Sequence, residues 1–256
     1  MNRATEEQLL TTIKERMKRS HSPWKEEGVF LFYDMGVEEK DTHLRGITLR
    51  SVDVTEDGKN RLDTLLQELE EDRRKIWNIR IPLGILPQWR EFFETRGYHV
   101  TEEEGYPAME RREEICWEPK FEVQWAKEEE DFLRCGPVLG EAFSLSQETA
   151  KKVLAVLKEG ELAFIADDKG KVLSCGILTK DEATQYAGLY YISTDTNHRG
   201  KGLAKDLVAA MTNEALQKGA KNVILQASDL GKFVYDRLGY VEVGRYTSFS
   251  NEEEDQ

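Results

Sequence analysis

The sequence feature that most constrains the fold is a short basic, glycine-containing segment between a strand-like run and a helix-like run. The strand-like run is Tyr190–Thr194, and a helix predicted from Gly202 to Lys218 has apolar residues at every fourth position, namely Leu203, Leu207, Met211 and Ala215. Arg199-Gly200-Lys201-Gly202 stands between the two. A helix that begins directly after such a loop leaves about four backbone N–H groups unpaired, and these amides, together with the helix dipole, bind anions. The sequence therefore predicts a phosphate site at this loop.

The residues around the two glycines exclude the common nucleotide-binding loops. A P-loop has Lys and then Ser or Thr after its last glycine, whereas Leu203-Ala204 follow Gly202 here. A dinucleotide-binding loop needs a third glycine, and Lys205 stands in that position. Glycine has no Cβ, so a phosphate can approach the backbone at both glycines. The flanking Arg199 and Lys201 add positive charge. The loop therefore fits a phosphate-bearing ligand of another kind.

The second half of the chain alternates predicted strands and helices. Apolar patterns and boundary residues predict strands over residues 121–125, 162–165, 172–178, 186–193 and 223–225 and from 240 onward. They predict helices over residues 132–143, 147–157, 202–218 and 230–238. The order along the chain is a strand, two helices, three strands, a helix, a strand, a helix and a strand. Ser146 is expected to cap the second helix, and Gly219 and Gly239 to end the last two. The turn Asp167–Gly170 predicts a hairpin. This order predicts an α/β (mixed α+β) fold.

Two motifs in this half resemble those of the GNAT superfamily of N-acetyltransferases. Arg199–Ala204 matches the R-x-x-G-x-A form of the loop that binds the coenzyme A pyrophosphate in that family, and Tyr235–Tyr240 looks like its Y-x-x-L-G-F/Y segment. The resemblance covers Phe121–Phe249, nearly the whole second half. It implies a GNAT-like acyl-CoA N-acyltransferase fold with a central mixed sheet, acetyl-CoA as cosubstrate and no metal.

The resemblance also implies roles for individual residues. The main chain at the strand end would hydrogen-bond the pantetheine arm and the loop would hold the pyrophosphate, so the expected cofactor-binding residues are Ile192, Ser193, Thr194, Arg199, Gly200, Lys201, Gly202, Leu203, Ala204 and Ser228. Tyr235 stands where family members place the residue that protonates the departing thiolate. A phenol of pKa ~10 suits a thiol leaving group of similar basicity. Tyr235 is expected to lie beside the apolar stripe of its helix, which favours a catalytic role over packing; that stripe is Leu230, Phe233, Val234 and Leu238.

A general base is harder to identify. Many relatives carry a Glu on the strand before the phosphate loop, but Tyr190–Thr194 contains no carboxylate. Asp195 could be the base, although a turn-forming Asp is favoured, and Glu141 is best interpreted as a solvated helix carboxylate. A water relay, or an acceptor amine that loses its proton on entry, therefore stays open. Cys175 lies within a predicted strand and is interpreted as a small core residue rather than a nucleophile.

The first half of the chain repeats part of the same order in diverged form. When Gly58-Lys59 is aligned with Gly200-Lys201, Gly97-Tyr98 falls on Gly239-Tyr240, and the helix predicted at Leu62–Leu69 falls on its counterpart. We interpret the chain as two tandem repeats, a degenerate GNAT-like domain over residues 1–117 and a GNAT acetyltransferase domain over residues 118–256. Coincidence between two ordinary α/β segments is the alternative.

The first half differs where the second half carries its motifs. Asp57, Asn60 and Phe93 stand where the alignment places Arg199, Gly202 and Tyr235. Each change removes one of the implied roles, so the first half is expected to have lost coenzyme A binding. It could persist as a scaffold, a wall of the substrate site or a dimer surface, and a homodimer is one assembly that it allows.

The charge of the chain limits its partners. The formal net charge is −13, with 36 Lys and Arg against 49 Asp and Glu, so neither nucleic acid nor an anionic membrane is expected as a partner. No run approaches the ~20 apolar residues that cross a bilayer, and the charged first residues do not form a secretory signal. The three cysteines and four histidines form no zinc pattern. We therefore expect a metal-free cytoplasmic protein.

The expected function is N-acetyltransferase activity. An acetyl (acyl) group would pass from acetyl-CoA to a primary amine of a small molecule, peptide or protein. The alternative is a noncatalytic acyl-CoA-binding sensor or interaction module, which the missing base favours and Tyr235 opposes. Nucleotide hydrolysis ranks third, because the sequence lacks the hydroxyl and carboxylate pattern that would hold Mg²⁺.

Overall fold

The computed structural model describes residues 3–35, 45–52, 54–71, 78–181 and 185–251 of the chain. The chain folds into two compact units: unit 1 comprises Met1–Pro107 and Val243–Gln256, and unit 2 comprises Ala108–Glu242. Unit 1 is therefore discontinuous in sequence, because most of the last strand of the chain belongs to it. Whether residues 1–117 and 118–256 are two homologous domains stays a prediction, since compactness says nothing about common descent.

The sheet of unit 2 is mixed, as predicted, and has the strand order β6-β11-β10-β9-β8-β7. Its strands are β6 (Tyr106–Arg111), β7 (Gln124–Trp125), β8 (Leu162–Ala166), β9 (Val172–Asp181), β10 (Tyr186–Thr194) and β11 (Asn222–Gln226). The strands from β7 to β10 pair antiparallel with their neighbours, and β6 is antiparallel to β11. Only β10 and β11 run parallel within this sheet, and the chain between them forms a helix. Parallel strands need such a crossover, because a tight turn cannot join them.

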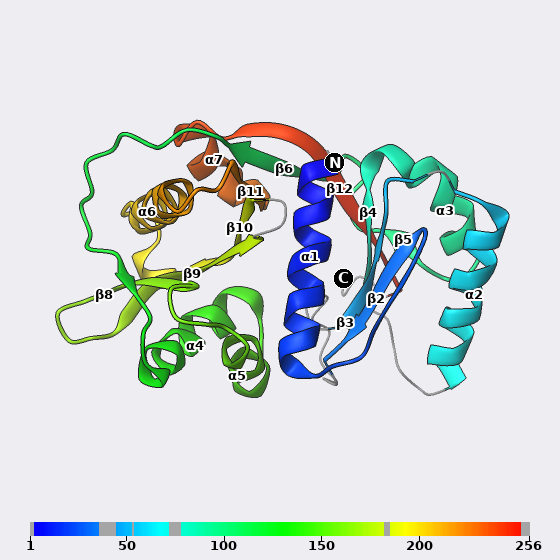
Figure 1. The fold of residues 1–256 in the computed structure, drawn as a ribbon, viewed down its shortest axis with the longest axis horizontal. Coiled ribbons are helices and arrows are strands. Elements are labelled where there is room, and N and C mark those ends of the chain that lie inside the picture. Colours follow the sequence, from blue (N-terminus) through cyan, green and yellow to red (C-terminus); the bar gives the residue numbers. More distant parts are fainter. Residues whose placement is uncertain (1–2, 36–44, 53, 72–77, 182–184, 252–256) are drawn as a thin grey trace. The chain divides into compact units, whose positions relative to one another are not determined.

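Helices cover both faces of this sheet. They are α4 (Glu129–Phe143), α5 (Gln147–Ala155), α6 (Leu203–Gln217) and α7 (Asp229–Arg237). Figure 1 shows α6 on one side of β8–β10 and the α4–α5 pair on the other. The predicted order of strands and helices is confirmed, although β7 is shorter than the predicted 121–125.

The predicted helix boundaries of unit 2 have local causes. The Thr149 amide donates to Ser146 Oγ at 3.1 Å, so Ser146 caps α5 as predicted. Gly219 and Gly239 follow α6 and α7 with φ of 85° and 74°, a backbone conformation that favours glycine. The hairpin between β8 and β9 is also confirmed, since the Asp167 amide donates to the Lys171 carbonyl at 2.9 Å.

Unit 1 has a mixed sheet of its own. Its elements are α1 (Arg3–Ser20), β1 (Trp24–Glu27), β2 (Phe30–Asp34), β3 (Arg45–Leu49), α2 (Glu56–Glu71), β4 (Asn78–Pro82), a 3₁₀ turn (Leu83–Ile85), α3 (Leu86–Glu94), β5 (His99–Val100) and β12 (Val241–Ser250). β1, β2 and β3 pair antiparallel in that order, β3 is parallel to β4, and β12 is antiparallel to both β4 and β5. A strand was predicted from Tyr240, but the sequence pattern does not indicate that its end, Tyr246–Ser250, pairs with β4.

The core of unit 1 lies between its sheet and α2 and α3. The fully buried side chains there include Phe30, Ile47, Leu62, Trp89, Phe93 and Phe249. The alternation of these residues along the strands places them on one face of the sheet. Figure 1 shows α1 on the opposite side of the unit 1 strands from α2 and α3.

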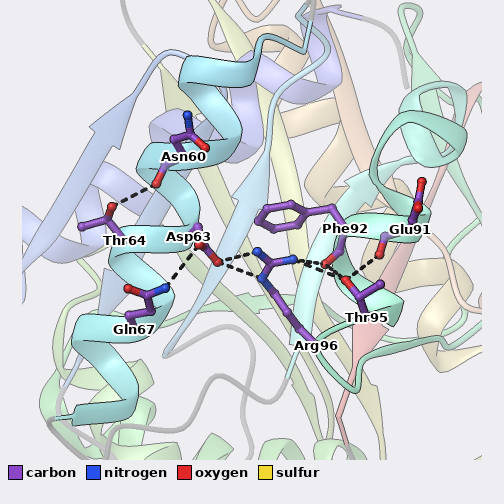
Figure 2. Close-up of polar contacts among 8 residues, drawn as sticks. All are labelled: Asn60, Asp63, Thr64, Gln67, Glu91, Phe92, Thr95 and Arg96. Carbon is purple, nitrogen blue, oxygen red and sulfur yellow. Dashed lines mark hydrogen bonds and ion pairs between the residues drawn. The ribbon is translucent and has the colours of Figure 1, made fainter.

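An arginine joins α2 to the segment after α3 (Figure 2). Arg96 contacts Asp63 Oδ1 through Nε at 2.9 Å and through Nη2 at 2.6 Å, and its Nη1 donates to the Phe92 carbonyl at 2.6 Å. Its guanidinium carbon lies 3.8 Å from the centroid of the Phe92 ring. The ion pair with Asp63 therefore ties α2 to the end of α3, and the cation–π contact with Phe92 holds the guanidinium in place.

Candidate active site

The candidate site begins where β10 separates from β11. Pairing between these parallel strands ends at Leu189 and Leu225, whereas β10 continues to Thr194. On its other side β10 remains paired with β9, but the register shifts between Tyr190 and Ser193. Tyr191 has a φ of 53°, which is uncommon for a non-glycine residue and marks a β-bulge. The end of β10 therefore has one edge that β11 does not occupy.

The predicted pantetheine contacts lie on this strand end. Ser193 is buried, and its Oγ donates to the Tyr191 carbonyl at 2.9 Å, which links the two ends of the bulge. Ser174 Oγ on β9 donates to the Ser193 carbonyl at 2.6 Å and lies 3.1 Å from Thr194 Oγ1. Ile192 faces α6, because it contacts the position where Gly176 would carry a Cβ, beside Met211. At the end of β10, a ligand can therefore reach the backbone edge that faces away from β9 rather than the side chains.

A polar turn follows β10 and fixes the start of the glycine loop. Asp195 accepts hydrogen bonds from the Asn197 amide at 3.0 Å and from Lys171 Nζ at 2.6 Å, and its Oδ1 lies 2.7 Å from His198 Nδ1. Lys171 and His198 lower the pKa of Asp195 from 3.8 to about 2. The expectation that Asp195 forms a turn is therefore confirmed. The i, i+2 and i, i+3 spacing within 195–198 indicates such a turn, but nothing in the sequence points to Lys171, which comes from the β8–β9 hairpin.

The glycine loop leads into α6 without a side-chain cap. Gly200 and Gly202 have φ of 77° and 98°, so both positions require the left-handed backbone conformation that glycine adopts readily. Gly202 is the N-cap of α6, and it makes no side-chain capping hydrogen bond. The first amide of this helix with a backbone acceptor is that of Asp206, which donates to the Gly202 carbonyl at 3.1 Å. In the described part of the chain, no acceptor is found for the amides of residues 200–205.

The side chains around this loop divide into charged and buried ones. Arg199 and Lys201 are exposed, and Arg199 Nε donates to the Thr194 carbonyl at 3.3 Å. Leu203 is buried in the core of unit 2, so only its amide is available to a ligand. No described atom lies within 4 Å of where a Cβ would stand on Gly200 or Gly202. Open amides, open space and two cations are the features that an anion-binding loop requires.

The second motif lies on α7, and its packing differs from the predicted one. Leu230 and Phe233 are 78% and 69% exposed, whereas Tyr235 is only 7% exposed and belongs to the core of unit 2. The stripe predicted from Leu230 and Phe233 was therefore wrong, because the helix turns its Tyr235 side inward. The Tyr235 ring lies 5.9 Å from the Tyr240 ring and contacts Gly231, where a Cβ would lie 3.0 Å from Cε2. Burial alone thus does not separate a catalytic role from packing.

Ser228 and Tyr240 both have structural partners next to this helix. Ser228 is the N-cap of α7, and its Oγ accepts a hydrogen bond from the Gly231 amide at 3.2 Å. The hydroxyl of Tyr240 lies 2.7 Å from Thr212 Oγ1 on α6, and burial raises the pKa of Tyr240. The first contact caps α7, and the second fixes the segment after α7 against α6.

The remaining candidates have structural partners as well. Glu141 is exposed at the end of α4, as predicted, and its Oε1 accepts from Thr196 Oγ1 at 2.6 Å. Cys175 is fully buried, which confirms its interpretation as a core residue. The neighbouring Cys175 and burial both raise the pKa of Cys135, so this thiol stays protonated and unreactive. Among the described residues, no group of three or more His, Cys, Asp or Glu could hold a metal ion.

Comparison with known proteins identifies the family of this fold. The sequence profile of the acetyltransferase (GNAT) domain matches residues 126–251. N-acetyltransferase 8B from Homo sapiens is 30% identical over 93 residues, and the probable N-acetyltransferase family 8 member 5 from Mus musculus is 28% identical over 94 residues. Each alignment covers 34% of this chain and 41% of the relative, so the chain matches less than half the length of these relatives.

Solved structures are similar over a larger part of the chain. A GCN5-related N-acetyltransferase from Kribbella flavida has a TM-score of 0.71 at 15% identity, and the match covers 96% of both chains. A GCN5-related N-acetyltransferase from Sphaerobacter thermophilus has a TM-score of 0.62 at 13% identity, over 86% of this chain and 79% of that one. At such identities the likeness concerns the fold. In the part of the chain that the structure describes, no helix is long and apolar enough to span a membrane. The profile therefore identifies residues 126–251 as an acetyltransferase (GNAT) domain, and the relatives and the fold agree with this assignment.

Proposed function

We propose that the protein is an N-acetyltransferase that transfers an acetyl group from acetyl-CoA to a primary amine of a small molecule, peptide or protein. The observation that carries the proposal is the open start of α6, where the amides of residues 200–205 have no acceptor among the described residues. A pyrophosphate would supply oxygens to these amides and negative charge to Arg199 and Lys201. Family membership supports the same ligand, since acyl-CoA thioesters are the donors that GNAT proteins use.

The free edge of β10 is the proposed seat of the pantetheine arm. Backbone groups of Ile192, Ser193 and Thr194 that face away from β9 would hydrogen-bond it as an additional strand, in the space that β11 leaves after Leu225. Ser228 at the start of α7 would border the same space from the other side. A linear ligand would thereby fit between the separated ends of β10 and β11, while the pairing of Tyr186–Leu189 with β11 stays intact.

In the proposed reaction, the acceptor nitrogen attacks the thioester carbonyl carbon, a C–N bond forms and the C–S bond breaks. We assign to Tyr235 the transfer of its phenolic proton to the leaving sulfur, and the acceptor nitrogen loses one proton. Its place on α7, in the motif that ends at Gly239-Tyr240, supports the assignment.

A second function, a noncatalytic acyl-CoA sensor, is favoured by one observation. Asp195 is the carboxylate next to the loop, and it is engaged by Lys171 and His198 with a pKa of about 2, so it is a poor base. The enzyme would then need a water relay or an amine that enters unprotonated. A sensor would need neither.

Acetyl-CoA turnover separates the two functions. The full chain is incubated with acetyl-CoA and a panel of polyamines, aminoglycosides and peptides, and thiol release and acetylated product are both measured. An enzyme acetylates at least one acceptor in stoichiometric balance with the thiol released. Tight acetyl-CoA binding with no transfer to any acceptor would favour the sensor, and absence of binding would contradict both.

We also propose that unit 1 descends from a tandem duplication and has lost coenzyme A binding. Both units contain a strand, a helix and a second, parallel strand: β3, α2 and β4 in unit 1, and β10, α6 and β11 in unit 2. A second helix follows in each, and each is succeeded by a glycine with positive φ, Gly97 and Gly239. This order supports common descent better than the sparse sequence identities do.

A further inference from the structure

A row of side chains crosses the sheet of unit 1 on the face that does not carry its core. Backbone register aligns Leu31 on β2 with Thr48 on β3, Thr48 with Arg80 on β4, and Arg80 with Ser248 on β12. Their neighbours along the strands, including Ile47, Ile79 and Phe249, lie in the core beneath α2 and α3. Because side chains alternate along a strand, the row faces the other way.

Arg80 is a buried cation in this row. It is only 7% exposed, and its Nε is buried with no hydrogen-bond partner among the described residues. Its guanidinium carbon lies 5.7 Å from the centroid of the Tyr246 ring, a weak cation–π contact. Within the described ranges, no carboxylate forms an ion pair with Arg80, whereas Arg45 and Arg50 in the same unit pair with Asp34 and Glu26. A buried charge without a counter-ion is costly to a fold, so this position calls for an anion.

Hydroxyl groups stand on both sides of Arg80. Thr48 is fully buried, and its Oγ1 also has no partner among the described residues. Ser248, on the other neighbouring strand, is 9% exposed. A guanidinium offers two parallel N–H donors, and flanking hydroxyls add further donors, which together match the oxygens of a carboxylate or phosphate group.

We propose that Arg80, Thr48 and Ser248 form a binding site in unit 1 for a small oxyanion, a carboxylate or phosphate group. The guanidinium supplies the charge, and the two hydroxyls complete the coordination. The site lies on strands β3, β4 and β12 of unit 1, and none of its residues belongs to the glycine loop of unit 2. It is therefore independent of the proposed acetyl transfer.

The test is the stability of the full chain as a function of added oxyanion. Urea unfolding is followed by tryptophan fluorescence in a low-salt buffer, with sodium phosphate, sodium acetate or sodium chloride at matched ionic strength. An anion that binds the folded state raises the unfolding midpoint in a saturable way. We expect phosphate or acetate to do so and chloride not to, and the more effective of the two identifies the group.

Two substitutions at the site should weaken its affinity for the oxyanion. Arg80→Met should weaken the oxyanion affinity about 10- to 100-fold, since charge-assisted hydrogen bonds are lost. In oxyanion-free buffer the same variant should unfold at the same or a higher urea concentration, because an unpaired buried charge is removed. Thr48→Val should weaken the affinity about 2- to 10-fold. The matched control is Thr247→Val on the opposite face, whose hydroxyl already donates to the Glu102 carbonyl at 2.7 Å; it should lower stability without changing the affinity.

The glycine loop could also bind phosphate, so Arg199→Ala is measured in parallel. A response that survives Arg199→Ala and is lost in Arg80→Met supports the site in unit 1, whether or not coenzyme A binds the loop. A response that Arg80→Met leaves unchanged, or no oxyanion response in the wild type, would overturn the proposal. Failure of the proposed acetyl transfer appears separately, as loss of acetyl-CoA turnover.

Discussion

The starts of α2 in unit 1 and α6 in unit 2 each lie between two parallel strands, yet they present different surfaces to an anion. At α2 the Gly58 amide donates to Thr55 Oγ1 at 3.1 Å, a side-chain cap. At α6, Gly202 provides no side-chain cap, and the amides of residues 200–205 have no acceptor among the described residues. The backbone bond of the first turn is the same in both, from Lys59 to Thr55 and from Asp206 to Gly202. A helix dipole is present in both, so the side-chain cap at Gly58 is what distinguishes the two helix starts.

The backbone conformation and the charge at the start of α2 are also less suited to an anion than those at the start of α6. Gly58 lies inside α2, packed so closely on Val29 that a Cβ would be 2.8 Å from Val29 Cγ1, whereas Gly200 lies in the loop with positive φ. Asp57, aligned with Arg199, pairs with Arg61 at 2.9 Å within α2 itself. These differences support the prediction that unit 1 does not bind coenzyme A.

The largest expected effect comes from giving unit 2 the residue that unit 1 carries. Tyr235→Phe introduces the counterpart of Phe93 and removes the proposed proton donor. We expect kcat to fall roughly 10- to 1000-fold with little change in acetyl-CoA affinity, measured by steady-state kinetics and calorimetry. Tyr240→Phe is the matched control: it removes the contact with Thr212 Oγ1, so it should cost about 1 kcal/mol of stability and leave kcat within about twofold. Equal kcat in Tyr235→Phe and wild type would remove Tyr235 from the mechanism.

A smaller effect is expected from adding one methyl group at each helix start. Gly202→Ala forces alanine into a φ of 98°, which costs about 1–2 kcal/mol or moves the amides, so coenzyme A affinity should fall about 5- to 30-fold by calorimetry. Gly58→Ala should instead lower the stability of the protein through the contact with Val29 and leave the affinity unchanged. Equal losses of affinity in both variants would mean that the two helix starts are not functionally distinct.

Local patterns in the sequence predicted most of unit 2. The helix predicted over 202–218 is α6 at Leu203–Gln217, and the one over 230–238 is α7 at Asp229–Arg237, because apolar spacing and a terminal glycine define both. The conformation of the glycine loop was also predictable, since its glycines and cations are contiguous in the sequence.

Contacts between residues distant in the chain were not predictable. Lys171 comes from a hairpin to pair with Asp195, and Tyr246–Ser250 pairs with β4 in unit 1, although nothing local marks either partner. The prediction of which side of α7 faces the core was wrong. Leu230 and Phe233 are apolar but exposed, and the side that carries Tyr235 packs into the core instead. Thr48 and Arg80 were missed because cross-strand register decides their neighbours.

The turn that holds the open loop predicts a pH dependence. The pKa of Asp195 is lower in the folded state, about 2 against 3.8, so its ionised form stabilises the fold at pH above about 4. This stability is lost as the pH falls through the folded value. The difference in unfolding free energy between wild type and Asp195→Asn should therefore shrink as the pH falls from about 4 to about 2. A difference that stays constant or grows over this range would contradict the pairing with Lys171 and His198.

The smallest effect concerns the scaffold of unit 1. Arg96→Ala removes the clamp between Asp63 and Phe92 (Figure 2) and should lower stability by about 1 kcal/mol in urea unfolding, without affecting coenzyme A affinity. The matched control is Arg61→Ala, whose pair with Asp57 is more exposed, and it should change stability by less than about 0.5 kcal/mol. An effect of Arg96→Ala no larger than that of Arg61→Ala would show that the clamp is dispensable.

The most direct measurement is the response of individual backbone amides to coenzyme A in ¹⁵N-labelled full-length protein, recorded by NMR. If a pyrophosphate occupies the start of α6, the amide resonances of residues 200–205 should move most and saturate together, while those of Gly58 and Lys59 stay in place. Shifts confined to other regions at saturating coenzyme A, or the largest shifts at Gly58 and Lys59, would contradict the proposal that the uncapped helix start seats the phosphates.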